Sequence, residues 1–397
     1  MNFIPRTANS SLQTLAKSYP AVIVTGPRQS GKTTLTQTVF PEKPYVSLED
    51  LDIREFASQD PRGFLNQYPD GAILDEVQRC PTIFSYLQTR LDRAKKMGMF
   101  VLTGSQQFGL LSDVSQSLAG RVAKIALLPF SFQELQNAQR EPKKIEQLLF
   151  TGLYPPIYDR NLEPSIWYHN YVDTYLERDV RQLIQVRNLS TFQRFLRMCA
   201  ARTGQLLNLS SLANDCGITH NTAKAWISVL EASFIIHLLQ PHHQNFNKRL
   251  IKSPKLYFYD SGLAAWLQNL QSPAHLSTHP ARGPLFETWV VSELVKYRFN
   301  HAMASNLYFW RDSSGNEVDV LVDQGHTLMP IEIKSGQTVV ADFFEGLTKF
   351  SILAGKKAST PSLIYGGEHV QTREKITVYP WKNIQALSPI LAPSAAK

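Results

Sequence analysis

The sequence has few cysteines. Only three occur in 397 residues: Cys80, Cys199 and Cys216. No two of them have metal-ligand spacing, and an odd number argues against a disulfide framework. The composition therefore excludes a cysteine-based zinc module and a disulfide-rich scaffold, and it favours a reducing, cytoplasmic setting.

The chain also lacks hydrophobic segments of the kind that enter membranes. Its first residues, MNFIPRTANSS, contain no apolar stretch typical of a signal peptide. No apolar run approaches the ~20 residues that a membrane-spanning helix needs. We therefore expect no membrane partner.

The composition is that of a globular protein with a basic balance. Hydrophobic residues make up 43% and aromatic residues 11%, values that allow each of two or three domains to bury a core. The formal net charge is +8. A basic chain favours an anionic partner, with DNA the leading candidate, although an ordinary basic protein has the same balance.

Residues 26–34, GPRQSGKTT, carry the pattern Gly-x-x-x-x-Gly-Lys-Thr of a P-loop. The loop follows the apolar run 21–24 and precedes a helical segment, the context that a P-loop requires. The pattern predicts a nucleoside triphosphate, ATP, with Mg²⁺. Lys32 can reach the β- and γ-phosphates, and the Thr33 hydroxyl can ligate Mg²⁺. The predicted cofactor-binding residues are Gly26, Pro27, Ser30, Gly31, Lys32, Thr33 and Thr34.

A second apolar strand, 72–74, ends in Asp75 and Glu76 about 40 residues after the P-loop. Asp75 can hold Mg²⁺ through its water shell. Glu76 is placed to orient or deprotonate the attacking water. Taken alone, an Asp-Glu pair is a solvated strand end, but the P-loop supplies the other half of a hydrolytic site.

A third apolar strand, 99–103, is followed by Ser105, to which we assign contact with the γ-phosphate or the attacking water. A simple strand-end turn is the alternative. Arg121, in the run 117–122, could stabilise the charge that develops on the γ-phosphate, in its own subunit or a neighbour's. A surface arginine is the alternative there.

Five runs now resemble a known family: GPRQSGKTT, AILDEVQ, VLTGSQ, SLAGRV and PFSFQEL, in this order. They are similar to those of AAA-type ATPases found beside a C-terminal DUF4143 region. The resemblance implies an α/β fold, an AAA+-like parallel sheet covered by helices, over residues 1–148. It gives Lys32, Thr33, Asp75, Glu76, Ser105 and Arg121 the Walker A, Walker B, sensor and arginine positions. Such relatives often form homo-oligomers, including rings.

The polar run 136–148 marks a boundary, after which 149–270 forms a second predicted domain. Residues 167–179 predict a helix with a packed aromatic face, and YLERDVRQL (175–183) resembles the start of DUF4143. Six arginines that follow could track phosphates or lie on helix surfaces: Arg178, Arg181, Arg187, Arg194, Arg197 and Arg202.

Residues 211–227 fit a helix–turn–helix, with Gly217 in the turn and Thr219 capping the second helix. Residues 244–249 and 255–260 read as a β-hairpin, so the whole predicts a winged helix. The winged-helix interpretation puts three side chains in the DNA major groove and two on the backbone: His220, Asn221 and Lys224, then Lys248 and Arg249. Many winged helices bind only protein, which remains the alternative.

A linker, 271–284, leads to a third predicted domain, 283–385. There the helix that begins at residue 285 carries Glu287, and three predicted strands follow at 307–311, 317–322 and 329–334. Asp319, Glu332 and Lys334 lie on the last two strands, and Glu332 and Lys334 share a face. Together with Glu287 they resemble the PD-(D/E)xK nuclease superfamily.

The carboxylates of such a set suit Mg²⁺ or Mn²⁺, which would activate water for phosphodiester cleavage. Lys334 would position that water or stabilise the transition state. Glu317 is a spare acid that could ligate instead. Two functions remain open: an ATP-driven enzyme that binds and cleaves DNA, or a regulatory ATPase whose nuclease-like domain only binds nucleic acid or a protein partner.

Overall fold

The computed structural model describes residues 3–105, 118–176, 189–242 and 252–392. Several predicted features lie outside these ranges. They are Ser117, Arg178, Arg181, Arg187, Lys248, Arg249 and the predicted hairpin arm 244–249.

The N-terminal part is built on a five-stranded parallel sheet of order β2-β3-β4-β1-β5. This confirms the predicted α/β class with a parallel sheet. The strands are β1 (Ala21–Thr25), β2 (Tyr45–Ser47), β3 (Ile73–Asp75), β4 (Phe100–Gly104) and β5 (Val122–Ala126). The helices are α1 (Ala8–Ser18), α2 (Lys32–Val39), α3 (Leu51–Gln59), α4 (Pro61–Asn66) and α5 (Ile83–Ala94).

The central strand β1 is buried along its whole length, and its alternate side chains enter two different cores. Val22 and Val24 share a cluster with Leu12 of α1 and Leu35 of α2. Ala21 and Ile23 belong to the cluster on the other face, which includes residues of α3, α4 and α5. Helices on both faces explain why β1 reads as a continuous apolar run.

The middle part begins with short helices: α7 (Phe132–Asn137), α8 (Ile145–Thr151), α9 (Pro155–Asp159) and α10 (Pro164–Tyr171), with the π-helical turn Val172–Leu176. Helix α8 runs through residue 148, where the first domain is predicted to end. Ile145, Leu148 and Leu149 are buried at helical spacing and hold α8 in the core.

The next elements follow the order helix, strand, helix, helix, strand, strand. They are α12 (Leu189–Ala201), β6 (Gln205–Leu206), α13 (Leu209–Cys216), α14 (His220–Ala232), β7 (Ile236–Leu239) and β8 (Lys255–Phe258), followed by α15 (Ser261–Leu267). The strands form an antiparallel sheet of order β6-β8-β7.

Gly217 and Thr219 have the local roles predicted for them. Gly217 ends α13 with φ of 67°, and the Thr219 hydroxyl accepts a 3.1 Å hydrogen bond from the Thr222 amide. Among the described residues, β8 pairs with β6 and with β7, and β7 lies before the arm predicted at 244–249.

The C-terminal part has a six-stranded mixed sheet of order β13-β14-β12-β11-β10-β9. Its strands are β9 (Leu307–Arg311), β10 (Glu317–Asp323), β11 (Leu328–Lys334), β12 (Ser362–Tyr365), β13 (Gln371–Arg373) and β14 (Ile376–Pro380). Its helices are α16 (Arg282–Asn300), α17 (Glu345–Ala354) and α18 (Ser388–Leu391), with 3₁₀ turns at Ala341–Phe344, Gly355–Lys357 and Trp381–Leu387. The predicted linker contains a further turn, Pro273–Ser277, and α16 already starts within it.

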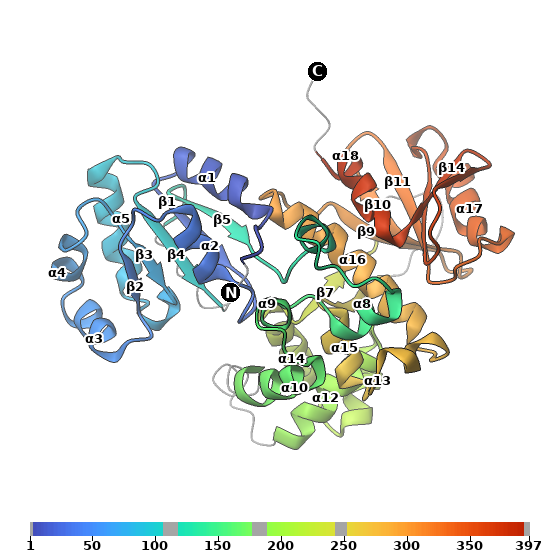
Figure 1. Cartoon of the computed structure of the whole chain (residues 1–397), viewed down its shortest axis with the longest axis horizontal. Helices are drawn as coiled ribbons and strands as arrows, with labels where there is room; N and C mark the ends of the chain where they lie inside the picture. Colours follow the sequence, from blue (N-terminus) through green and yellow to red (C-terminus); the bar gives the residue numbers. More distant parts are fainter. Residues whose placement is uncertain (1–2, 106–117, 177–188, 243–251, 393–397) are drawn as a thin grey trace.

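The middle and C-terminal parts share one hydrophobic core. A single cluster joins Leu149 of α8, Leu263 of α15, Val290 of α16 and Ile331 of β11. In Figure 1, α16 lies between the C-terminal sheet and the rest of the molecule. On the other face of this sheet, α17 packs over Val318 and Leu363. The two parts therefore pack against each other through α16 and are not connected by a linker alone.

All three cysteines are buried and free. Among the described residues, no helix combines the length and apolarity that crossing a bilayer demands.

Candidate functional site

The P-loop has the predicted strand–loop–helix setting. Gly31 adopts a left-handed conformation with φ of 91° and immediately precedes α2, which begins at Lys32. Only 6% of Lys32 is exposed, and its ammonium donates to the carbonyl oxygens of Gly26 (3.1 Å) and Pro27 (2.8 Å). These bonds hold the lysine against the loop whose amides would surround the phosphates.

The loop fits a phosphate group on two observations. The Ser30 hydroxyl is buried and has no hydrogen-bond partner among the described residues. A Cβ atom at Gly26, where φ is 150°, would lie 2.1 Å from the Leu127 carbonyl oxygen, so only glycine allows this close approach. An unsatisfied hydroxyl beside a glycine-shaped cradle suits a hydrogen-bonding anion.

The Asp75 carboxylate lies at the centre of a hydrogen-bonded group. It accepts 3.1 Å bonds from the Thr33 hydroxyl and a 2.8 Å bond from the Tyr45 hydroxyl, and it also accepts from the Thr103 hydroxyl. Thr33 and Asp75, the two residues predicted to serve Mg²⁺, are therefore adjacent. Burial, followed by the bond to Asp75, raises the pKa of Tyr45 above its usual range.

Glu76 and Ser105 also meet, as their assigned roles require. Glu76 has a left-handed backbone with φ of 54°. The Ser105 hydroxyl donates to Glu76 Oε2 at 3.1 Å, and the Gln78 amide donates to both Glu76 and the Ser105 oxygen. A non-glycine residue in this conformation is strained, and such strain is often found at functional positions. The two neighbours fix the carboxylate beside the P-loop.

The space in front of the P-loop is a pocket of about 290 Å³ between two parts of the molecule. One wall is the P-loop with Glu76, and the other is α9 with the following residue, Arg160. The Trp167 indole on α10 donates a 3.1 Å hydrogen bond to the side chain of Gln29 in the loop. The middle part thus contacts the P-loop directly.

Arg121 is far from this pocket. Its carbonyl oxygen accepts from the Ala21 amide at the start of β1, whereas the P-loop follows the end of that strand. The guanidinium pairs with both carboxylate oxygens of Asp92, at 2.6 and 2.9 Å. Because five strand residues span roughly 16 Å, Arg121 does not reach the phosphate site of its own subunit. A contact with a neighbour's site stays a prediction.

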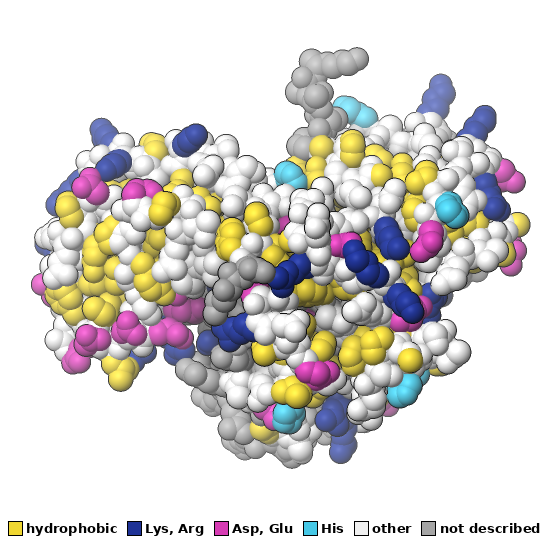
Figure 2. All heavy atoms as spheres, viewed as in Figure 1, with side chains coloured by type: hydrophobic (Ala, Val, Ile, Leu, Met, Phe, Trp, Pro, Cys, Tyr) yellow, Lys and Arg dark blue, Asp and Glu magenta, His cyan; other side chains and the backbone are white. Residues whose placement is uncertain are grey.

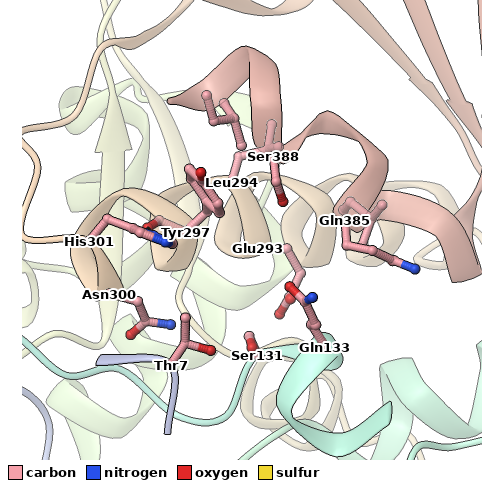
Figure 3. A pocket seen from close by; sticks show the side chains of 12 residues that line it. Thr7, Ser131, Gln133, Glu293, Leu294, Tyr297, Asn300, His301, Gln385 and Ser388 are labelled. Atoms are coloured by element: carbon pink, nitrogen blue, oxygen red, sulfur yellow. The ribbon is translucent and has the colours of Figure 1, made fainter. Parts of the chain in front are cut away.

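A buried ionic junction lies behind the P-loop. Arg6 donates to the Ser30 carbonyl oxygen (2.7 Å), to the Leu128 carbonyl oxygen (2.6 Å) and to Glu134 (3.2 Å). Figure 3 shows the small pocket beside this junction, where Thr7, Ser131 and Glu293 approach one another from separate elements. Glu293 of α16 accepts from the Phe132 amide at 2.8 Å, so α16 is bonded to the segment that holds Arg6.

The C-terminal residues predicted to form a nuclease-like site also come together. Lys334 Nζ lies 2.5 Å from Glu332 Oε1 and 3.9 Å from Asp319 Oδ2. Asp319 accepts from the Ile333 amide at 2.9 Å. Burial, reinforced by the charge of Asp319, raises the pKa of Glu332 to about 8.

Lys255, which was not predicted to belong to this site, lies among these acids. It comes from β8 of the middle part, and its ammonium is 3.0 Å from Glu287 Oε1 and 3.7 Å from Asp319 Oδ1, with Glu317 in direct contact. Within the described ranges, no three His, Cys, Asp or Glu side chains are placed to hold one metal ion. The residues therefore do not fit the predicted Mg²⁺ or Mn²⁺, because a lysine occupies the position between the carboxylates.

Several residues of both sites lack a local sequence pattern. Tyr45, Thr103 and Gln78 surround the Walker B acids, and Arg160 and Lys255 arrive from other elements. Lys255 is the first residue of the otherwise apolar strand KLYF, and this pattern does not indicate an ionic role.

Three family models match successive parts of the chain. Residues 18–136 match an AAA domain, residues 142–274 match a domain of unknown function, DUF8612, and residues 282–384 match DUF4143. The run at 175–183 that resembles the start of DUF4143 therefore falls within the DUF8612 match.

Uncharacterized proteins of Mycobacterium bovis and Mycobacterium tuberculosis are each 29% identical over 370 residues, covering 92% of this chain and 80% of theirs. Among solved structures, a Walker-type ATPase of Pyrococcus abyssi has a TM-score of 0.46 at 15% identity, covering 66% of this chain and 94% of that one. AMPPCP-bound DnaA from Aquifex aeolicus has a TM-score of 0.28 at 18% identity, covering 56% and 85%. The chain is thus similar to an AAA domain over residues 18–136 and to DUF4143 over residues 282–384, and the geometry of the P-loop agrees with the first match.

Proposed function

We propose that this protein is an ATP-hydrolysing switch that binds DNA through its middle part. The observation that carries the proposal is the position of the nucleotide pocket. Its walls come from the P-loop and from α9 with Arg160, which belong to different parts of the chain. A ligand in that pocket contacts both walls, so its hydrolysis can change how they fit together.

Each residue of the ATP site has a role that its contacts support. Ser30 and the loop amides bind phosphate oxygens, and Lys32 neutralises their charge. Thr33 and Asp75 would hold Mg²⁺, which supplies charge stabilisation when bound. Glu76, fixed by Ser105 and Gln78, orients the attacking water and takes its proton.

Support for DNA comes from residues 189–258. Their order of helices and strands, with α14 following a glycine turn, supports the winged-helix interpretation. His220, Asn221 and Lys224 are all exposed at the start of α14. Figure 2 shows Lys and Arg side chains gathered near the centre of one face. Outside residues 189–258, a separate groove is lined by Lys143, Lys144 and Arg373. Exposed polar and basic groups of this kind suit phosphates and base edges.

The test is nucleotide-dependent DNA binding, followed by the fluorescence anisotropy of a labelled duplex. The Glu76→Gln variant with ATP and the wild type with ADP represent the two nucleotide states. We expect their duplex affinities to differ at least about fivefold, the low end of coupling between sites. Lys224→Glu should weaken binding and flatten its salt dependence, whereas the exposed Lys349→Glu on α17 should not. Equal affinities in both nucleotide states would refute the switch.

DNA cleavage is the second candidate, favoured by the meeting of Asp319, Glu332 and Lys334. The position of Lys255 counts against it. A panel of DNAs incubated with Mg²⁺ or Mn²⁺, with and without ATP, decides the matter. Cleavage that Asp319→Ala abolishes would establish a nuclease; equal and negligible cleavage by both proteins would leave the binding role.

A further inference from the structure

The acidic cluster of the C-terminal part is filled by a cation from another part of the chain. Four carboxylates meet there: Glu287 on α16, Glu317 and Asp319 on β10, and Glu332 on β11. Lys255 enters from β8, which belongs to the three-stranded sheet of the middle part. The contact therefore joins two sheets that share no strand.

Lys255 is held on every side. Only 3% of the residue is exposed, and its ammonium contacts Glu287, Glu317 and Asp319. The ammonium also lies 5.7 Å from the centre of the Phe309 ring. Tyr257, two residues along β8, donates a 2.5 Å hydrogen bond to the same Glu287 oxygen. Two side chains of one strand thus recognise one carboxylate.

The charges of the cluster are nearly balanced without any added ion. If all four carboxyl groups are counted as ionised, they face three cations, Lys255, Lys334 and Arg311, which leaves a formal charge of −1. Removing the Lys255 charge would make the cluster more negative by one unit charge, which favours the binding of another cation. In addition, Glu332 Oε2 is buried and accepts no hydrogen bond among the described residues, so the cluster retains an unused oxygen ligand.

We propose that Lys255 is the resident cation of this cluster, where it takes the place of a divalent metal ion and latches the middle sheet to the C-terminal sheet. While the latch is closed, the cluster does not bind metal. When Lys255 is withdrawn, the same four carboxylates form a site for a divalent cation. The metal ion and the Lys255 ammonium are thus alternative occupants of the cluster. Replacement of the lysine by a metal ion would therefore indicate that β8 has moved. This inference rests on the C-terminal cluster alone and does not depend on ATP hydrolysis.

The test uses the nucleotide-free full chain and Mn²⁺, whose binding is followed by electron paramagnetic resonance. Lys255→Met keeps the length of the side chain and its packing against Phe309 while it removes the charge. Lys252→Met, an exposed lysine three residues earlier, is the matched control. We expect Lys255→Met to bind Mn²⁺ at least about 100-fold more tightly than the wild type, since the positive charge that competes with the ion for the carboxylates is removed. Adding Asp319→Asn should abolish the gain, and Lys252→Met should behave as wild type.

Thermal unfolding of the same proteins keeps the proposal testable if Lys255→Met is unstable. Mn²⁺ should then raise the midpoint of Lys255→Met, or allow it to refold, and should leave the wild-type midpoint unchanged. Three results would overturn the proposal: wild-type Mn²⁺ binding that Asp319→Asn removes, a folded Lys255→Met that binds no more Mn²⁺ than wild type, or an unstable Lys255→Met that Mn²⁺ fails to rescue.

Discussion

The side chains of the proposed ATP site divide into two that we propose bind phosphate and one that we propose takes part in the reaction. Lys32 and Ser30 belong to the P-loop, whereas Glu76, the proposed proton acceptor, is held by Ser105 and Gln78. The division predicts that the two classes of variant fail in different ways. Binding variants lose affinity, and the reactive variant keeps it.

Replacing Lys32 by alanine should raise the Kd for ATP and lower turnover by about 100-fold or more, because the phosphate charge is no longer compensated. Isothermal titration and a phosphate-release assay measure the two quantities. A Lys32→Ala variant with normal ATP affinity and turnover would show that the P-loop lysine does not serve ATP binding or hydrolysis.

Replacing Glu76 by glutamine should preserve ATP affinity while slowing hydrolysis by about 100- to 10 000-fold, the range for a lost general base. The same two assays apply, with Gln59→Glu, an exposed change on α3, as a control. Full turnover by Glu76→Gln would mean that another group activates the water.

The raised pKa of Glu332, about 8, makes the stability of the fold depend on pH. Between pH 4.5 and 8 the unfolded chain releases this proton while the folded chain retains it. The unfolding free energy therefore falls as pH rises, by at most about 4 to 5 kcal/mol at this site. Glu332→Gln should remove that slope, so its stability relative to wild type should increase from pH 5 to pH 9.

Chemical denaturation at the two pH values checks the Glu332 prediction, with the exposed Glu345→Gln on α17 as the control. A relative stability that decreases from pH 5 to pH 9 would contradict the assignment.

Secondary-structure elements meet behind the P-loop through buried charges rather than apolar packing alone. Arg6, which precedes α1, binds the P-loop backbone and Glu134 of α7, and the adjoining Phe132 amide binds Glu293 of α16. Lys296, one turn along α16, donates to the Phe130 carbonyl oxygen at 2.9 Å. The helix that carries Glu287 is thus bonded to the segment behind the nucleotide loop.

Arg6→Ala should destabilise the fold by about 3 to 5 kcal/mol, since it leaves Glu134 buried without its cation. Arg6→Ala combined with Glu134→Gln should be less harmful than the sum of the two single changes. Urea denaturation measures both, and the exposed Arg93→Ala provides the baseline. A loss below about 1 kcal/mol for Arg6→Ala would show that the junction is not structural.

The sequence predicted those elements whose role depends on the spacing of residues that are close together in the chain. The P-loop and the Asp75-Glu76 strand end are such cases, because their geometry follows from a strand, a turn and a helix in succession. Thr219 and Gly217 likewise specify their cap and turn locally. Lys255 and Tyr45 could not be predicted in this way, because their partners are brought to them by pairing and packing between distant segments.

Arg121 illustrates the converse. The sequence run around Arg121 resembles a family motif, but Arg121 lies just before β5, at the amino ends of the parallel strands. The P-loop follows the carboxyl end of β1, so the motif does not indicate how far Arg121 lies from the proposed ligand. Sequence order alone could not reveal that separation.

The whole molecule places its nucleotide pocket at the contact between the ATPase sheet and the middle part. Arg160 is the cation that the middle part brings to that pocket. Arg160→Ala should weaken ATP binding or turnover about tenfold and should also reduce the effect of nucleotide on duplex affinity. Arg93→Ala, on the outer helix α5, should change neither. Unchanged nucleotide dependence in Arg160→Ala would place the coupling elsewhere.

ATP turnover as a function of duplex concentration tests most directly whether the nucleotide pocket and the DNA-binding surface are coupled. If nucleotide and DNA are coupled, the reciprocity of linked binding means that DNA should alter the nucleotide affinity of the wild type, and we expect its turnover to change as well. Lys224→Glu should require more duplex for the same effect, and Lys32→Ala should show no turnover at any concentration. Wild-type turnover that is absent, or that duplex leaves unchanged at every concentration, would contradict the account.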